Sequence, residues 1–445
     1  MTEEGVSPAS IEIGERLARF DGEVKRYHRR NFIVAVVHFI VLRLGWIFKT
    51  ESVIIPGFVG RLAHLACPHM EGFVLSLIPV ISRLGRGLPQ LVVAQRVEHL
   101  PRHSRAFMLS VALFTVPWGF FFFVLFFAPA TSPSVLLILF FLSYATFWLA
   151  SGASRTLFGV LQGKLIAVES RGRLFAWSQT VGCFIAAGAA LLMREFLKEG
   201  GLAFPSNYAI IFGLSFLFFA LCLGVLFFLK EPAYPQPNRR TSLGHFLSRT
   251  LELFRQDKNF RRLAIAQALT SMTFLLFPYY IKLGRDFVGV GEGMFAYFVI
   301  AQNLANGTNS WIMGRMADRK GNKRPLCIIA TIAVTIPLLA LLLARLPGAP
   351  WAYTLVFLII GMLPATMRIR VNYVLELAPI AKHPIYVAAL NSTQVLTVAL
   401  SPLIGLAIDA FSFTPVFLIV AVVAAAGAML TFTLIEPRHQ QRGAL

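Results

Sequence analysis

The chain has 445 residues, of which 57% are hydrophobic and only 14% are charged, and this apolar excess excludes a water-soluble globular protein. The formal net charge of +20 does not indicate a nucleic-acid partner, because the cations gather between long apolar stretches, as membrane topology requires. We therefore expect the lipid bilayer as the main partner and no nucleic acid.

The first 30 residues lack the apolar core of a signal peptide and are predicted to form a short cytosolic lead-in. A hydrocarbon layer of about 30 Å needs roughly 20 apolar residues for each helical crossing. Twelve segments meet this requirement, and they predict twelve transmembrane helices, at 31–56, 70–94, 105–128, 133–163, 174–197, 206–230, 261–284, 291–313, 325–345, 351–376, 384–408 and 412–435.

Basic residues gather in alternate gaps between these segments. Arg29 and Arg30 precede the first segment, Arg102 and Arg105 lie in the second gap, and "GRMADRKGNKRP" at 314–325 fills the eighth. By contrast, the third gap, "APATSPS", carries no charge. The positive-inside rule therefore predicts that both termini are cytoplasmic, and a compact chain without a signal peptide favours a bacterial inner membrane.

The sixth gap, 231–260, is the longest and most polar, and it divides the chain into six-helix halves at 31–230 and 261–435, with a short tail at 436–445. An internal repeat supports this division. With an offset of 220 residues, Ala94 aligns with Gly314 and Glu98 with Asp318. The predicted fold is an all-α integral membrane protein with two pseudosymmetric halves.

Charged and polar side chains occur inside several predicted spans. An arginine near the bilayer centre costs roughly 2.5–3.5 kcal/mol on insertion scales, so it should face a cavity or a partner. Helical spacing places Arg83, Arg86 and Gln90 on one face of the second span. The candidate binding or coupling residues in the spans of the first half and in the eighth span are Arg43, Glu51, Arg83, Arg86, Gln302, Asn303 and Asn306.

These residues predict an anionic ligand, since arginine offers paired donors to a carboxylate or a phosphate ester. Glu51 is the acid placed to take up a proton, or to pair with Arg83 or Arg86 from the second span. For Lys49, Lys282 and His38 a structural role is favoured over a ligand-binding one. The four cysteines lie singly, and nothing in the sequence requires a metal or an organic cofactor.

The segment 314–325 resembles the signature loop of the major facilitator superfamily, which joins the second and third helices of a half. The resemblance rests on Gly314, Asp318, Arg319, Gly321, Lys323 and Arg324. It implies the twelve-helix fold and a gating role, in which Asp318 latches the two halves together. Gly314 and Gly321 are expected to permit close helix approach and a tight turn, while Lys323 and Arg324 anchor the loop at the inner leaflet.

A second resemblance lies in the fourth span. "SGASRTLFG", residues 151–159, is similar to the helix-four motif of proton-coupled members of that family, with Arg155 as its arginine and Phe158 in place of a glutamine. By the internal repeat, Arg368 and Arg370 are its approximate counterparts, with a functional role and a structural one both open.

The function predicted from these features is secondary active transport of a small organic anion by alternating access, coupled to protons. Multidrug or sugar-type efflux or uptake is the alternative within the same class. A membrane enzyme is disfavoured because the 231–260 loop has no site-like spacing of nucleophiles or acids, and a non-transporting sensor or scaffold on the same fold remains an alternative of another class.

Overall fold

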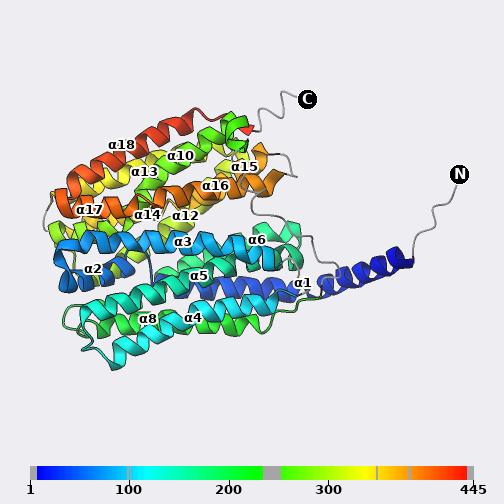
Figure 1. Cartoon of the computed structure of the whole chain (residues 1–445), viewed down its shortest axis with the longest axis horizontal. Helices are drawn as coiled ribbons and strands as arrows, with labels where there is room; N and C mark the ends of the chain where they lie inside the picture. Colours follow the sequence, from blue (N-terminus) through cyan, green and yellow to red (C-terminus); the bar gives the residue numbers. More distant parts are fainter. Residues whose placement is uncertain are drawn as a thin grey trace.

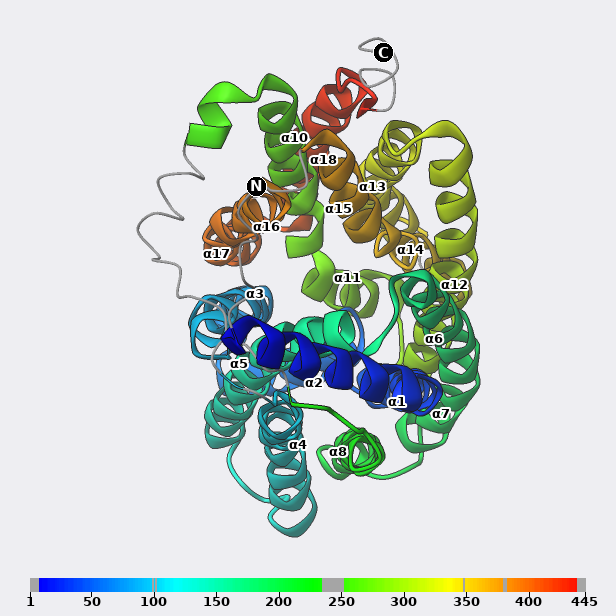
Figure 2. The ribbon, with the colours of Figure 1, turned by 90° about the vertical axis from the view of Figure 1, so that its right-hand side faces the viewer.

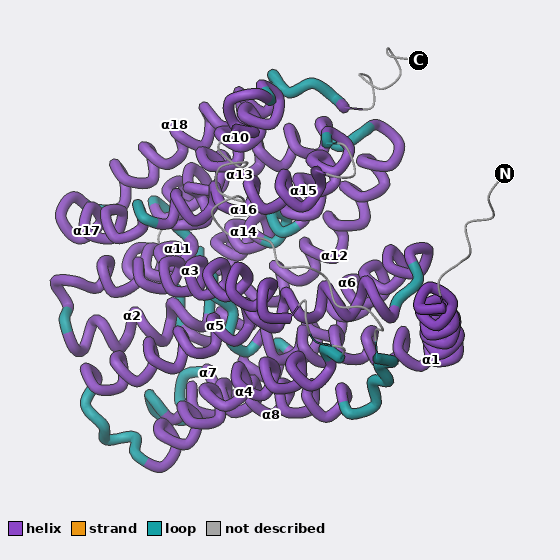
Figure 3. Tube along the Cα trace, turned by 45° about the vertical axis from the view of Figure 1, so that its right-hand side comes forward, coloured by secondary structure: helices purple, strands orange, loops and turns teal. Residues whose placement is uncertain are grey.

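The computed structural model of the protein describes residues 8–97, 100, 102–233, 252–346, 349–378 and 382–437. Within these ranges the regular structure is helical and contains no strand (Figures 1 and 3). Glu98 of the predicted repeat, most of the predicted 231–260 linker and the end of the predicted tail lie outside the described residues.

The first half is built from eight α-helices and one short 3₁₀ turn. Their bounds are α1 Pro8–Ile47, α2 Ile54–Ala66, η1 Pro68–Met70, α3 Glu71–Val97, α4 Ser104–Phe127, α5 Pro133–Leu165, α6 Val168–Ala189, α7 Leu191–Leu197 and α8 Ser206–Leu226. The lead-in predicted for residues 1–30 is not a separate element, because α1 runs through residue 30 without a break.

The second half repeats this plan with more interruptions. Its elements are α10 Lys258–Leu275, α11 Phe277–Leu283, η2 Gly284–Val288, η3 Glu292–Met294, α12 Phe295–Lys320, α13 Lys323–Ala344, α14 Pro350–Ile360, α15 Ala365–Leu377, α16 His383–Val398, α17 Ser401–Phe411 and α18 Phe413–Phe432. Each of the twelve predicted spans therefore overlaps with one helix or with a pair of helices separated by a short break, but α2 and α12 continue beyond the predicted spans, to Ala66 and Lys320.

Proline explains three of these breaks. Pro278 and Pro402 stand in the first turns of α11 and α17, and Pro364 immediately precedes α15, where a missing N–H does no harm. By contrast, Pro79 and Pro89 lie inside the uninterrupted α3. The break between α1 and α2 was not predicted, because the segment 31–56 was read as one helix.

Nine of the described helices or helix pairs are long and apolar enough to cross a membrane. The predicted spans that fall short of this criterion correspond to α3, α12 and the α16–α17 pair. These helices carry arginine, asparagine and glutamine side chains that lower their hydropathy, and the same side chains line the cavity described below.

The two halves lie side by side, and both termini lie at the same end of the molecule (Figure 1). We call this the termini end and the opposite end the far end. Across the seam α3 packs against α17 and α6 packs against α12, as the view along the helices shows (Figure 2). At the α3–α17 crossing the backbones of Gly72 and Gly405 meet so closely that a Cβ atom on either glycine would lie within 3 Å of the other backbone.

Candidate functional site

The α1–α2 break places polar residues deep inside the molecule. Residues 48–53 form turns between the two helices, and Thr50, Glu51 and Ser52 from this stretch line a central cavity. The Thr50 hydroxyl accepts a hydrogen bond from the Ile54 N–H at 3.1 Å, which satisfies one of the free donors at the start of α2. The break therefore exposes side chains that a continuous helix would distribute around its circumference.

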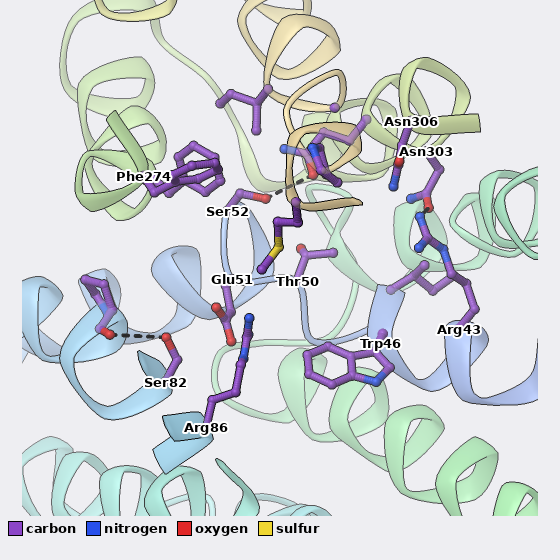
Figure 4. A pocket seen from close by; sticks show the side chains of 18 of the residues that line it. Arg43, Trp46, Thr50, Glu51, Ser52, Ser82, Arg86, Phe274, Asn303 and Asn306 are labelled. Atoms are coloured by element: carbon purple, nitrogen blue, oxygen red, sulfur yellow. Dashed lines mark hydrogen bonds between the residues drawn. The ribbon is translucent and has the colours of Figure 1, made fainter. Parts of the chain in front are cut away.

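The central cavity has a volume of about 530 Å³ and lies between the two halves. Four arginines, Arg43, Arg83, Arg86 and Arg368, and a single carboxylate, Glu51, contribute to its walls. The structure brings together seven of the eight predicted binding or coupling residues, Arg43, Glu51, Arg83, Arg86, Gln302, Asn303 and Asn306. Figure 4 labels all of these except Arg83 and Gln302. The eighth, Arg155, lines an adjoining chamber instead.

Three of the cavity arginines are oriented by an amide from the opposite half. Arg43 donates to Asn303 Oδ1 at 3.0 Å and Arg83 donates to Gln394 Oε1 at 2.6 Å. In the third pair the arginine belongs to the second half and the amide to the first: Arg368 of α15 donates to Gln179 Oε1 of α6 at 2.9 Å. A neutral amide fixes the direction of a guanidinium without neutralising it, so the charge stays available for a ligand.

The side chains of Glu51 and Arg86 lie beside each other in the cavity lining, as Figure 4 shows. Neither Glu51 Oε1 nor Arg86 Nε has a hydrogen-bond partner, although both atoms are buried. The Arg86 guanidinium instead stacks 4.4 Å from the centroid of the Trp148 ring. The predicted Glu51 pairing with Arg83 or Arg86 is therefore not formed as an ion pair between these described residues, and the acid retains an unused acceptor.

Lys49 does not reach the cavity. Its ammonium is fully buried within the first half, 3.7 Å from the Phe147 ring centroid and 3.8 Å from that of Trp46. His38 is buried as well, with Nδ1 3.0 Å from the Cys222 sulfur. Both residues pack in the interior of the first half and do not line the cavity, as the structural interpretation of the sequence predicts.

At the far end, charged side chains tie the two halves together. The buried Glu71 carboxylate at the start of α3 forms an ion pair with the Lys282 ammonium at 2.8 Å and a second ion pair with Arg285. Arg61 of the first half pairs with Glu292 of the second at 2.9 Å. Lys282 thus has a structural ion pair, as predicted.

The Asp409 carboxylate of α17 also joins the two halves at the far end. It accepts hydrogen bonds from the Gly72 N–H at 2.7 Å and the Phe73 N–H at 2.9 Å, both in the first turn of α3. An acid at a helix N-terminus is stabilised by the unsatisfied N–H groups there. The far end of the cavity is therefore closed by contacts from both halves.

The predicted gating motif spans the end of α12 and the start of α13. Gly314, Asp318 and Arg319 lie in the last turns of α12, and Lys323 and Arg324 begin α13. Gly321 ends α12 with φ +82°, a conformation that favours glycine, and a Cβ atom there would collide with the Glu436 carboxylate. Glu436 also accepts from the Lys323 N–H at 2.8 Å. The tight turn predicted at Gly321 is confirmed, but the close helix approach predicted at Gly314 is wrong, since a Cβ atom there would have no neighbour within 4 Å.

The first half has the same arrangement at the equivalent turn. Glu231, just after α8, accepts from the His103 and Ser104 N–H groups at 2.6–2.9 Å and from Lys164 at 2.7 Å. Burial alone raises the pKa of Glu231, but Lys164 and the two backbone donors outweigh burial and hold the pKa below its usual value. In each half, therefore, a glutamate that follows the last helix caps the N-terminus of the third span, and this shared carboxylate cap supports the predicted duplication.

Some cavity residues were not predicted as site residues, namely Gln179, Gln394, Thr50 and Ser52, while the role of Arg368 was left open. A signal for the two glutamines exists in the sequence. Gln179 and Gln394 stand at the same distance from the starts of α6 and α16, so each half supplies a glutamine at the equivalent place of its fifth helix. Among the described residues, no group of three histidine, cysteine or acidic side chains could hold a metal ion.

Comparison with known proteins is consistent with this architecture. The sequence model of the Major Facilitator Superfamily matches residues 69–367 and 310–444. A crystal structure of a D-xylose–proton symporter has a TM-score of 0.69 and 15% sequence identity, covering 90% of this chain and 98% of the symporter.

A crystal structure of a variant of the nucleoside transporter NupG has a TM-score of 0.66 and 11% identity, covering 91% of this chain and 99% of that one. At these identities the two structures establish the shared fold. No curated protein matches the sequence.

Proposed function

The chain belongs to the Major Facilitator Superfamily, and on that premise we propose that it carries a small organic anion across the membrane together with a proton. Members of the family are multi-pass membrane transporters that work by alternating access, so this chain is a transporter and not an enzyme. The ligand class, the coupling ion and the orientation are parts of the proposal.

One observation carries the proposed ligand class: the central cavity presents four arginines and one carboxylate. Arginines in a cavity of about 530 Å³ need a counter-charge, and a carboxylate or phosphate ester can supply it through paired hydrogen bonds. The amides that hold Arg43, Arg83 and Arg368 keep their guanidinium groups directed without cancelling their charge.

Proton coupling would follow from the position of Glu51. Its carboxylate and a bound anion compete for the same guanidinium groups, above all for Arg86, which Figure 4 places beside it. A proton on Glu51 removes the competing negative charge and thereby favours the anion. Each anion would then enter with one proton, and Glu51 Oε1, which has no partner, is free to carry it.

With cytoplasmic termini, as the positive-inside rule predicts, the far-end closure corresponds to an inward-facing arrangement. The ion pairs of Glu71 and Arg61 and the hydrogen bonds of Asp409 hold the halves together at the end away from the termini. In the alternate state these contacts would open. Asp318 at the end of α12 and the tight turn at Gly321 would then help to close the termini end, in the gating role that the sequence predicts.

A neutral sugar is the second candidate. The Gln302 amide nitrogen is buried without a partner, and Trp46 forms part of the cavity wall. Unused amide donors beside an aromatic face suit a hydroxylated ligand. This candidate leaves the four arginines without a counter-charge from the ligand.

A thermal-shift screen of the purified protein in detergent separates these candidates. The panel contains organic anions, phosphate esters, sugars and lipophilic cations, and a ligand that binds the native state raises the melting temperature. Arg83→Ala is measured beside the wild type, with Arg315→Ala as the matched control, because Arg315 stacks on Trp311 away from the cavity.

We expect anions to stabilise the wild type and Arg315→Ala but not Arg83→Ala. Stabilisation by sugars or by lipophilic cations that Arg83→Ala leaves unchanged would overturn the anion proposal. A chain that binds an anion but shows no counterflow in proteoliposomes would instead be a sensor on the transporter fold.

A further inference from the structure

A second chamber of about 280 Å³ adjoins the central cavity. Its polar walls come from α3, α5 and α16, and include Arg83, Arg86, Gln90, Arg155, Asn391 and Gln394. None of the described residues that line it is acidic. Arg83, Arg86, Met367 and Gln394 line both spaces, so the two are neighbours that share one wall.

The second chamber lies on the termini side of the central cavity. Helix α3 runs from the far end toward the termini end, and Gln90 follows Arg83 by seven residues, about 10 Å along the helix axis. Asn391 likewise precedes Gln394 on α16, which begins at the termini end. A solute that moves between the central cavity and the termini end would pass this chamber.

Arg155 distinguishes the chamber from the central cavity, because it lines only the chamber. Its side chain is exposed to this space, and among the described residues no hydrogen bond or ion pair engages it. Arg86, on the shared wall, has a buried Nε without a partner. Two guanidinium groups with unused donors therefore border a space that holds no carboxylate.

We propose that this chamber is a second anion site, in which Arg155 and Arg86 hold one phosphate or carboxylate group of a soluble ligand. This inference rests on the proposed function and deepens it: the transported anion meets two sites in series. Arg155 and Arg86 hold it in the chamber, and Arg43, Arg83 and Arg368 receive it in the central cavity. The anion passes between them along the wall formed by Arg83 and Arg86.

Site-directed protection from thiol labelling tests the proposal with inorganic phosphate as the probe. Thr156 lines only the second chamber and Leu42 lines only the central cavity, so Thr156→Cys and Leu42→Cys report the two spaces separately. Both are made in a Cys67→Ser background, since the remaining three cysteines are buried. The purified full chain in detergent is labelled with a negatively charged methanethiosulfonate at increasing phosphate concentration.

We expect phosphate to slow labelling at both positions. Arg155→Gln should raise the phosphate concentration for half-protection at Thr156→Cys by about tenfold or more, the effect of losing a charged hydrogen bond, with little change at Leu42→Cys. Arg43→Gln should raise the phosphate concentration for half-protection at Leu42→Cys, with little change at Thr156→Cys. Arg155→Lys should restore part of the protection at Thr156→Cys. Unchanged protection at Leu42→Cys shows that Arg155→Gln is folded.

Three results would overturn the second site. The first is protection at Thr156→Cys that Arg155→Gln leaves unchanged. The second is protection at Thr156→Cys that Arg43→Gln abolishes, as a single site requires, and the third is protection by phosphatidylglycerol where phosphate gives none. Protection at Leu42→Cys alone would reject the second site and leave the proposed function standing. Absence of protection at both positions, for phosphate and for the anions of the thermal-shift panel, would reject both.

Discussion

The two halves of the chain share a plan but meet the central cavity with different chemistry. The first half contributes charge through Arg43, Glu51, Arg83 and Arg86. The second half contributes mainly amides through Gln302, Asn303, Asn306 and Gln394, together with the single charge of Arg368. The difference suggests a division of labour, in which charges from one half select the ligand and amides from the other direct those charges.

The largest effect is expected from removing a charge from the first half. Arg83→Ala deletes a guanidinium that Gln394 already holds toward the cavity at 2.6 Å. Since a hydrogen bond to a charged group contributes about 1.5–3 kcal/mol, anion affinity should fall roughly 10–100-fold. Counterflow in proteoliposomes measures this loss, and Arg315→Ala should transport like the wild type. An equal loss of anion transport in Arg83→Ala and Arg315→Ala would mean that any arginine on the protein contributes, and not specifically the one in the cavity.

Glu51→Gln should separate binding from coupling. The substitution removes the proposed proton carrier but retains a polar side chain of the same size at the α1–α2 break. Anion counterflow should persist at the wild-type rate or within a few-fold of it, while accumulation driven by an imposed pH gradient should disappear. If the pH gradient still drives accumulation in Glu51→Gln, another group carries the proton.

Removing an amide from the second half should have a smaller effect. Asn303→Ala leaves the Arg43 charge in place but removes the acceptor that orients it at 3.0 Å. We expect the half-saturating anion concentration to rise about 5–10-fold, corresponding to a net hydrogen-bond contribution near 1 kcal/mol. Asn309→Ala is the matched control, because Asn309 lies on the same helix and donates to the Met362 carbonyl.

A double-mutant cycle sharpens this result. If Asn303 acts through Arg43, the effect of Asn303→Ala on affinity should vanish in an Arg43→Ala background. A full effect in that background would mean that Asn303 contacts the ligand directly, and the two halves would then both select it.

The smallest effect on transport is expected at the two carboxylate caps at the termini end, where substitutions change stability instead. Glu231 is engaged by His103, Ser104 and Lys164, whereas Glu436 Oε1 lacks a partner. Glu231→Gln should destabilise the protein by about 1–3 kcal/mol, and Glu436→Gln by less. Thermal melts in detergent compare the two variants, and a larger loss in Glu436→Gln would contradict this ranking.

The pH dependence of the Glu231 contribution has a definite sign. Because the pKa of Glu231 is held below its usual value in the folded protein, its stabilisation is present at neutral pH. It is lost as the pH falls through that lowered pKa, where the folded carboxylate takes up a proton. The Tm difference between wild type and Glu231→Gln should therefore shrink on acidification, and a difference that grows instead would contradict the assignment.

Much of this architecture could be predicted from the sequence. The length of each apolar segment is set by the thickness of the bilayer, and basic residues gather in the loops on one side of it. Helical spacing likewise placed Arg83 and Arg86 on one face of α3, and both line the cavity. The sequence prediction misses the α1–α2 break, although Pro56 in the first turn of α2 is a local signal for it, because a proline cannot continue a helix from the preceding turn. Of the aromatic side chains that surround the buried Lys49 ammonium at this break, Phe147 and Trp148 come from a distant part of the chain, which no local pattern encodes.

The hydrogen-bond partners of the cavity arginines could not be predicted from the sequence either. Arg83 and Gln394 are 311 residues apart and meet because the halves pack across the seam, a contact that no local pattern encodes. The separation of Arg155 from the central cavity has the same origin, since it depends on how α3, α5 and α16 enclose a second space.

Proton-linked calorimetry tests the central claim most directly. The anion with the largest thermal shift is titrated into the purified protein in two buffers that differ in ionisation enthalpy, which counts the protons bound with each anion. We predict up to one proton taken up per anion by the wild type and none by Glu51→Gln. Anion binding without proton uptake at every pH, or uptake that Glu51→Gln leaves unchanged, would contradict the account.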